Sequence, residues 1–171
     1  LQIVDLTNLP NTVSLVAEIQ DERVGKAHNI YIDTARALMY LCLVSPIVNG
    51  SENSLIPIRV YSLENPLSPQ IVFSGIDDLD EVHDLEVRGE IAILSCGFQG
   101  MRVYDFTDPT NPIYLSNLEF YQEQGYNHQG SLSEDGKTYV FADETPGTKI
   151  KKCSVSEDFT IQIQQGFGVE N

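Results

Sequence analysis

The stretch MRVYDFTDPTNPIYLS, residues 101–116, contains two short apolar segments joined by a polar turn. Its first and last parts are rich in β-branched and aromatic residues, which favour strands. Its middle part, TDPTNP at 107–112, favours a tight turn, because an Asp side chain can bond nearby backbone amides and proline fixes φ. The stretch therefore predicts two antiparallel strands.

The same pattern occurs elsewhere in the chain. LQIVDLTNLPNTVSLV begins at Leu1 and IRVYSLENPLSPQIVF at Ile58, and a weaker copy without the proline, IKKCSVSEDFTIQIQ, begins at Ile150. A second repeated element lies between these copies: AHNIYIDTARALMYLCLV (27–44), VHDLEVRGEIAILSCGF (82–98) and NHQGSLSEDGKTYVFAD (127–143). Each of these reads as a strand, a turn of small or polar residues, and a more apolar strand.

Together the two elements make four short antiparallel strands in about 40 to 55 residues, the period typical of β-propeller blades. We therefore predict an all-β fold: a partial β-propeller of about three and a half four-stranded blades, belonging to a larger ring. The predicted blades cover approximately 1–19 (an outer half), 27–76, 82–118 and 127–171. The remaining blades of the same polypeptide are expected partners. The polar insertion at 45–57 is expected to be a surface loop.

Composition narrows the possible partners. The formal net charge of −15 argues against nucleic acid, whose phosphates an acidic surface repels. No apolar run approaches the roughly 20 residues that span a bilayer, so no membrane-spanning segment is expected. Three cysteines (Cys42, Cys96 and Cys153) lack any close metal-type spacing, and we expect them to be reduced and structural.

The segments LQIVDL, IRVYSLENP and MRVYDFTDPTNP resemble the LVIVD repeat. With AHNIYID, VHDLEV and NHQGSLSEDGKTYVFADE, they are similar to the choice-of-anchor B proteins built from such repeats. Ser62 departs from the repeat, which has Asp at the positions of Asp5 and Asp105, and KKCSVS departs from it in the last blade. The resemblance implies a β-propeller in an extracellular or cell-surface protein, with an anchoring segment elsewhere in the polypeptide. It implies no particular reaction.

All three histidines of the chain occupy one position of the second repeated element. His28, His83 and His128 each open the first strand of a blade, and the first strand of a propeller blade lines the central channel. The three side chains would then lie around one channel mouth. Imidazoles suit a divalent transition metal such as Zn or Cu, and three of them leave positions open for water or substrate. The predicted second shell consists of Asn29, Asp84, Gln129, Asp143 and Glu144.

Two interpretations of this column stay open. In the first, the histidines are structural, and the propeller binds a protein, glycan or small-molecule ligand on its channel face. In the second, the chain belongs to a metal-dependent enzyme, a hydrolase or an oxidoreductase, with His28, His83 and His128 as ligands. Convergence of the imidazole nitrogens would favour the second interpretation, and imidazoles that point apart would favour the first.

Overall fold

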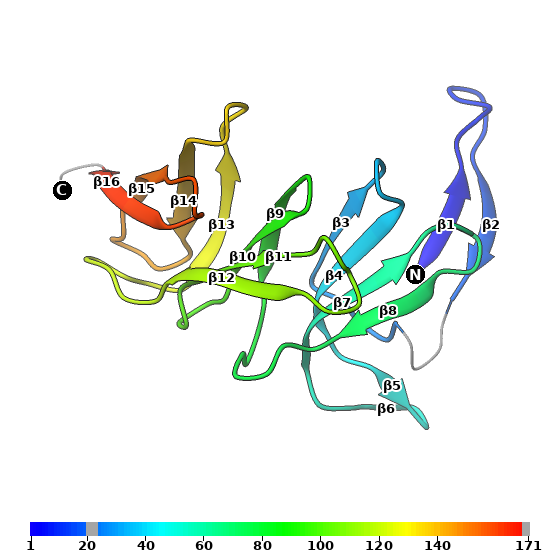
Figure 1. Cartoon of the computed structure of the whole chain (residues 1–171). Helices are drawn as coiled ribbons and strands as arrows, with labels where there is room; N and C mark the ends of the chain where they lie inside the picture. Colours follow the sequence, from blue (N-terminus) through cyan, green and yellow to red (C-terminus); the bar gives the residue numbers. More distant parts are fainter. Residues whose placement is uncertain (20–23, 169–171) are drawn as a thin grey trace. The chain divides into compact units, whose positions relative to one another are not determined.

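The computed structural model describes residues 1–19 and 24–168, and every regular element in this part of the chain is a β-strand (Figure 1). No helix among these residues could cross a membrane. Residues 169–171, at the end of the last predicted blade, lie outside the described part. The strands are β1 Gln2–Asp5, β2 Ser14–Glu18, β3 Asn29–Asp33, β4 Leu38–Val44, β5 Ile47–Val48, β6 Ser51–Glu52, β7 Ile56–Ser62, β8 Gln70–Ser74, β9 Asp84–Arg88, β10 Ile91–Ser95, β11 Met101–Asp105, β12 Ile113–Leu118, β13 Asn127–Leu132, β14 Thr138–Asp143, β15 Ile150–Val155 and β16 Ile161–Phe167.

The chain forms two compact units, Leu1–Gly75 and Ile76–Asn171. The first unit contains the two-stranded sheet β1-β2 and the four-stranded sheet β3-β4-β7-β8. The second contains two four-stranded sheets, β9-β10-β11-β12 and β13-β14-β15-β16. All of these pairings are antiparallel, and each four-stranded sheet follows chain order. The predicted all-β class and four-stranded antiparallel blades are therefore confirmed.

The turns after the repeated strands each contain the same type of hydrogen bond. The side chain at the end of the strand accepts a bond from the backbone amide two residues on: Thr7 to Asp5 (2.9 Å) and Thr107 to Asp105 (2.7 Å). Ser62, which departs from the repeat, accepts the same bond from Glu64 through its hydroxyl oxygen (3.3 Å). Serine can thus replace aspartate here because the turn requires only a short side-chain acceptor.

The insertion at 45–57 is largely exposed, as predicted, but it is not an irregular loop. It contains a small hairpin in which Ile47 pairs with Glu52 and Val48 with Ser51. Asn49 and Gly50 form its turn, with φ values of 53° and 77°. Such a turn requires positive φ at both central residues, and Asn-Gly is a preferred pair for it.

Each unit has its own apolar core. In the second unit the core joins both blades, because side chains of β10 and β11 pack in one cluster with those of β14, β15 and β16. Its buried members are Ile93, Met101, Val103, Tyr139, Phe141, Cys153 and Ile161. All three cysteines of the chain are buried thiols outside any disulfide. Burial raises the pKa of the Cys96 thiol to about 12. A thiol with this pKa stays protonated near neutral pH when no metal ion is bound to it.

The shared turn bond gives a stability test. We expect Asp105→Ala to lower the free energy of unfolding by about 1 kcal/mol, because the Thr107 amide loses its acceptor. Asp105→Ser should keep most of that stability, since Ser62 makes the same bond naturally. Urea unfolding measures both. Asp77→Ala, which removes a carboxylate from an exposed residue, is the matched control. Equal losses for the Ala and Ser variants of Asp105 would contradict this account of the turn.

Candidate functional site

Two of the three histidines lie together in the second unit. The ring centroids of His83 and His128 are 4.6 Å apart, and Nε2 of His128 lies 3.6 Å from Oε2 of Glu144. One ligand atom from each of these three residues lies within 4.8 Å of the other two. His83 is buried, His128 is partly exposed and Glu144 is exposed, so the cluster extends from the protein interior to solvent.

The backbone places the two imidazoles in different ways. The His83 amide donates to the Ser95 carbonyl (2.7 Å), which extends the pairing of β9 with β10 by one residue. His128 lies at an irregularity in the pairing of β13 with β14, where Asn127 pairs with Asp143 and Gln129 with Ala142. His128 therefore has no partner in the strand register. Such bulges are common next to active sites, where they redirect a side chain.

Glu144 reaches the imidazoles because the chain continues past β14 in a fixed path. The Glu144 amide donates to the Tyr126 carbonyl (2.8 Å), and the Tyr126 amide donates to the Thr145 hydroxyl (2.9 Å). These bonds hold the two segments that carry His128 and Glu144 against each other. Glu144, which the sequence places in a second shell, is the carboxylate nearest to the histidines in this cluster.

Tyr126 packs against the cluster from the side. Its ring makes an edge contact with His83 at 5.3 Å between centroids. Burial raises its pKa, with further contributions from a hydrogen bond to Glu81 and from the charge of Glu144. The Glu81 carboxylate and the Tyr126 ring fill the space beside Gly97, so any side chain at position 97 would overlap both. Gly97 also has a φ of 54°, which suits glycine.

The third histidine, His28, lies in the first unit, directly before β3. Its amide donates to the Cys42 carbonyl (2.9 Å), the same backbone bond that His83 makes with Ser95. His28 and His83 are therefore equivalent in their blades. A ring formed by all three imidazoles stays a prediction.

The other predicted second-shell residues have contacts of their own. Oδ1 of Asn29 accepts from the Ile30 amide (2.8 Å), and Oδ1 of Asp84 accepts from the Leu85 amide (2.7 Å). Gln129 is exposed and lines a separate cavity of about 430 Å³.

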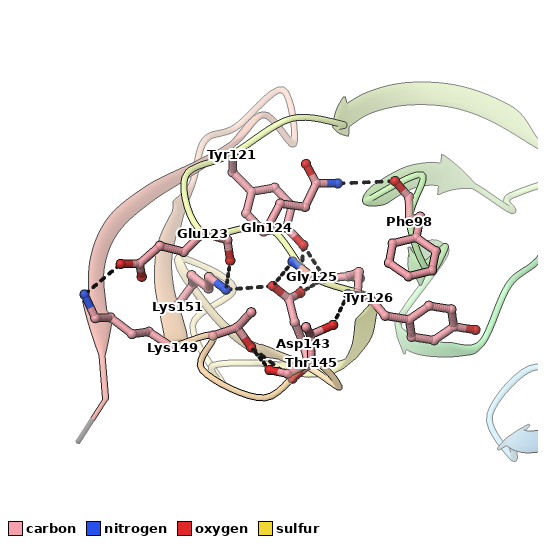
Figure 2. Close-up of polar contacts among 12 residues, drawn as sticks. Phe98, Tyr121, Glu123, Gln124, Gly125, Tyr126, Asp143, Thr145, Lys149 and Lys151 are labelled. Carbon is pink, nitrogen blue, oxygen red and sulfur yellow. Dashed lines mark hydrogen bonds and ion pairs between the residues drawn. The ribbon is translucent and has the colours of Figure 1, made fainter. Parts of the chain in front are cut away.

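Asp143 belongs to a buried ion pair. Its Oδ2 lies 2.7 Å from Nζ of Lys151, and both side chains are almost completely buried. Lys151 also donates to the Glu123 carbonyl (3.0 Å), and Asp143 accepts from the Tyr121 hydroxyl (2.7 Å) and the Gly125 amide (3.0 Å). Figure 2 shows the Lys151 ammonium between the Glu123 carbonyl and the Asp143 carboxylate.

This ion pair supports the histidine cluster. Asp143 is the neighbour of Glu144 in sequence, and it pairs with Asn127, the neighbour of His128. The ion pair thus fixes Asp143 and its partner Asn127, which directly precede Glu144 and His128. The sequence contains no signal for this role, because Lys151 and Asp143 lie in different strands without a motif.

A cavity of about 510 Å³ lies elsewhere in the second unit, along β15, β16 and the segment after β12. Its charged groups are paired with one another or with Asp143: Lys149 with Glu123 (3.0 Å) and Lys151 with Asp143 (2.7 Å). The metal-ligand cluster is therefore the stronger candidate for chemistry, although it lies at the ends of the inner strands and not in this cavity.

No protein-family model matches the sequence, and no curated protein matches it. Solved structures do resemble it. The chain is similar to a 6-phosphogluconolactonase candidate from Bacteroides uniformis, with 11% identity and a TM-score of 0.64 over 93% of this chain and 47% of that one. It is similar to the periplasmic gluconolactonase of Pseudomonas aeruginosa, with 14% identity and a TM-score of 0.59 over 92% of this chain and 46% of that one.

A third similar structure is a hypothetical selenium-binding protein from Sulfolobus tokodaii, with 14% identity and a TM-score of 0.59 over 84% of this chain and 42% of that one. The chain thus spans about half the length of these proteins or less. At such identities the similarity shows the fold alone, a partial β-propeller. The resemblance to LVIVD-repeat proteins and the surface location stay predictions.

The buried ion pair gives a second test. We expect Lys151→Met to lower the free energy of unfolding by about 3–5 kcal/mol, because the Asp143 carboxylate would stay buried without its cation. Lys152→Met is the matched control, since the neighbouring Lys152 is exposed and should change stability by less than about 0.5 kcal/mol. Urea unfolding measures both variants. Equally small losses of stability in both variants would show that the ion pair contributes little to the free energy of unfolding.

Proposed function

We propose that this chain is a ligand-binding part of a β-propeller in which His83, His128 and Glu144 hold a divalent transition metal ion. The observation that carries the proposal is the closeness of three ligand atoms, all within 4.8 Å of one another. Two atoms bound tetrahedrally to one zinc ion at about 2.1 Å lie about 3.4 Å apart. The 3.6 Å between His128 and Glu144 is close to that value, so small side-chain movements would complete the site.

The donor set suits zinc or non-haem iron. Two imidazoles and one carboxylate form a ligand set that zinc uses in hydrolases, and non-haem iron uses the same set in oxygenases. Three protein ligands leave at least one position for water or for an oxygen atom of a ligand. Glu144, being exposed, keeps that position accessible to solvent. The proposed metal site thus gives the channel face a means of binding small molecules.

Zinc binding by the three residues is directly measurable. In calorimetric titrations of the whole chain, we expect His83→Ala, His128→Ala and Glu144→Gln each to weaken zinc binding by at least about 100-fold, because each removes a ligand. Glu134→Gln, at an exposed residue of the β13–β14 turn, is the control. The same titrations with copper, nickel and ferrous iron identify the preferred metal. Unchanged zinc affinity in the three variants would refute the site.

His28→Ala tests the larger ring. A loss of zinc affinity equal to that of His83→Ala would make His28 a fourth ligand. No change in affinity would limit the site to the second unit.

A second candidate function is metal-dependent hydrolysis of a lactone. Two points favour it: three protein ligands would leave a coordination position of the metal open, and two of the similar structures are a gluconolactonase and a 6-phosphogluconolactonase candidate. Held by His83, His128 and Glu144, such a metal would lower the pKa of its bound water to about 7 and so would supply the hydroxide needed to hydrolyse a lactone.

We therefore expect the zinc-loaded chain to hydrolyse D-glucono-1,5-lactone faster than the buffer does. His128→Ala should reduce the rate to the uncatalysed level, because the metal is lost. A pH-stat assay follows the acid released. Zinc binding without any acceleration would leave metal-dependent ligand binding as the function and remove hydrolysis.

A further inference from the structure

The aromatic side chain of Phe98 extends the candidate site toward solvent. Its ring makes an edge contact with the ring of Tyr126 at 5.2 Å between centroids (Figure 2). Tyr126 in turn contacts His83 at 5.3 Å between centroids. The Phe98 side chain is 73% exposed. Single exposed apolar side chains are common on protein surfaces, so it is the contact of Phe98 with Tyr126, beside the candidate site, that makes this ring a candidate binding surface.

The turn that carries Phe98 is held firmly. Gly97 and Gly100 both have positive φ, and the Cys96 amide donates to the Gly100 carbonyl (2.8 Å). The Gln99 side chain accepts from the Asp80 amide (2.8 Å) and donates to the Asp78 carbonyl (3.0 Å).

On the other side of the turn, Nε2 of Gln124 donates to the Phe98 carbonyl (3.3 Å; Figure 2). The ring is thus presented by an anchored backbone, which lowers the entropy lost when a ligand stacks on it.

The charged groups that act on Tyr126, the ring that Phe98 contacts, are carboxylates. Glu81 bonds Tyr126, and Glu144 lies close enough to affect it electrostatically. The cation bound to the turn, Arg102, donates to the Gln99 carbonyl (2.9 Å) and pairs with Glu119 (3.7 Å). Carboxylates accept hydrogen bonds from hydroxyl groups and repel phosphate.

We propose that Phe98 is a stacking platform that makes the His83–His128–Glu144 site selective for a neutral saccharide ring. This inference rests on the proposed metal site and names its ligand class. One face of the sugar would stack on Phe98, one of its oxygens would approach the metal, and its hydroxyls would donate to Glu81 and Glu144. A purely aromatic ligand would stack equally well but would leave both carboxylates without donors. A phosphorylated sugar would meet their charge.

Two exposed phenylalanines allow a matched experiment. Phe120 is 81% exposed and lines the separate cavity of about 510 Å³, so Phe120→Ala is the control for Phe98→Ala. The methyl glycosides of glucose, galactose and mannose, glucose 6-phosphate and phenol are titrated into the zinc-loaded whole chain, with binding followed by saturation-transfer NMR.

We expect at least one methyl glycoside to bind, and Phe98→Ala to weaken it by about 2- to 10-fold, the range of aromatic contact energies. Phe98→Trp should retain binding, Phe120→Ala should not change it, and glucose 6-phosphate should bind at least about 5-fold more weakly than the glucoside. Zinc affinity should be the same in wild type and Phe98→Ala, because Phe98 is no ligand.

The inference fails if no glycoside binds, if Phe98→Ala binds as well as wild type, or if glucose 6-phosphate or phenol binds better than every methyl glycoside. The zinc titration separates this failure from that of the metal site. A glycoside that binds through Phe98 without zinc would keep the platform and remove the metal. Zinc binding with no glycoside binding would keep the metal site and remove the stacking platform.

Discussion

The ion pair between Asp143 and Lys151 is the constraint on which the candidate site depends. Two opposite charges in an apolar interior stabilise the fold only if their remaining hydrogen-bonding capacity is satisfied. Here Tyr121, Gly125 and the Glu123 carbonyl supply those bonds. All three lie in the loop between β12 and β13, so the pair fixes that loop to β14 and β15. The same loop ends at Tyr126, whose ring packs on His83.

The blade of His128 differs from the blades of the other two histidines. In the blades of His28 and His83, the histidine amide simply bonds the adjacent strand, at Cys42 and Ser95. Any residue with a backbone N–H could make that bond, so strand pairing alone does not require histidine at this position. In the blade of His128 the register is irregular, and the imidazole turns toward Glu144. The repeat places a histidine at the start of each blade, and in the last blade the bulge turns the His128 side chain toward Glu144.

The repeated turns made the fold predictable from the sequence. Strand, turn and strand recur because each turn needs a short side-chain acceptor at the end of the strand, and Asp5, Ser62 and Asp105 all provide one. The hairpin inside 45–57 was also encoded, by Asn49-Gly50, although the polar composition of that segment concealed it. Turns of this kind can be predicted from the sequence because they depend on residues that are close together in the chain.

The site was only partly predictable for the same reason. The repeat column places His83 and His128 at equivalent positions, and equivalent positions on adjacent blades lie close together. Glu144 was predicted as a supporting residue, but its contact with His128 depends on the bulge, which no local pattern announces. The roles of Lys151, Tyr126 and Phe98 depend on contacts between separate strands and loops. Long-range contacts of this kind leave no periodic signal.

The chemistry of the site follows from its position between an acidic surface and an apolar interior. Carboxylates at the surface, Glu144 among them, attract a cation, and burial of His83 limits the freedom of the ligand that would hold it. A metal ion would in turn offset the repulsion among neighbouring carboxylates, so metal binding and local stability should reinforce each other. The blade repeat brings the imidazoles of His83 and His128 together, and the proposed metal site adds to them the exposed carboxylate of Glu144.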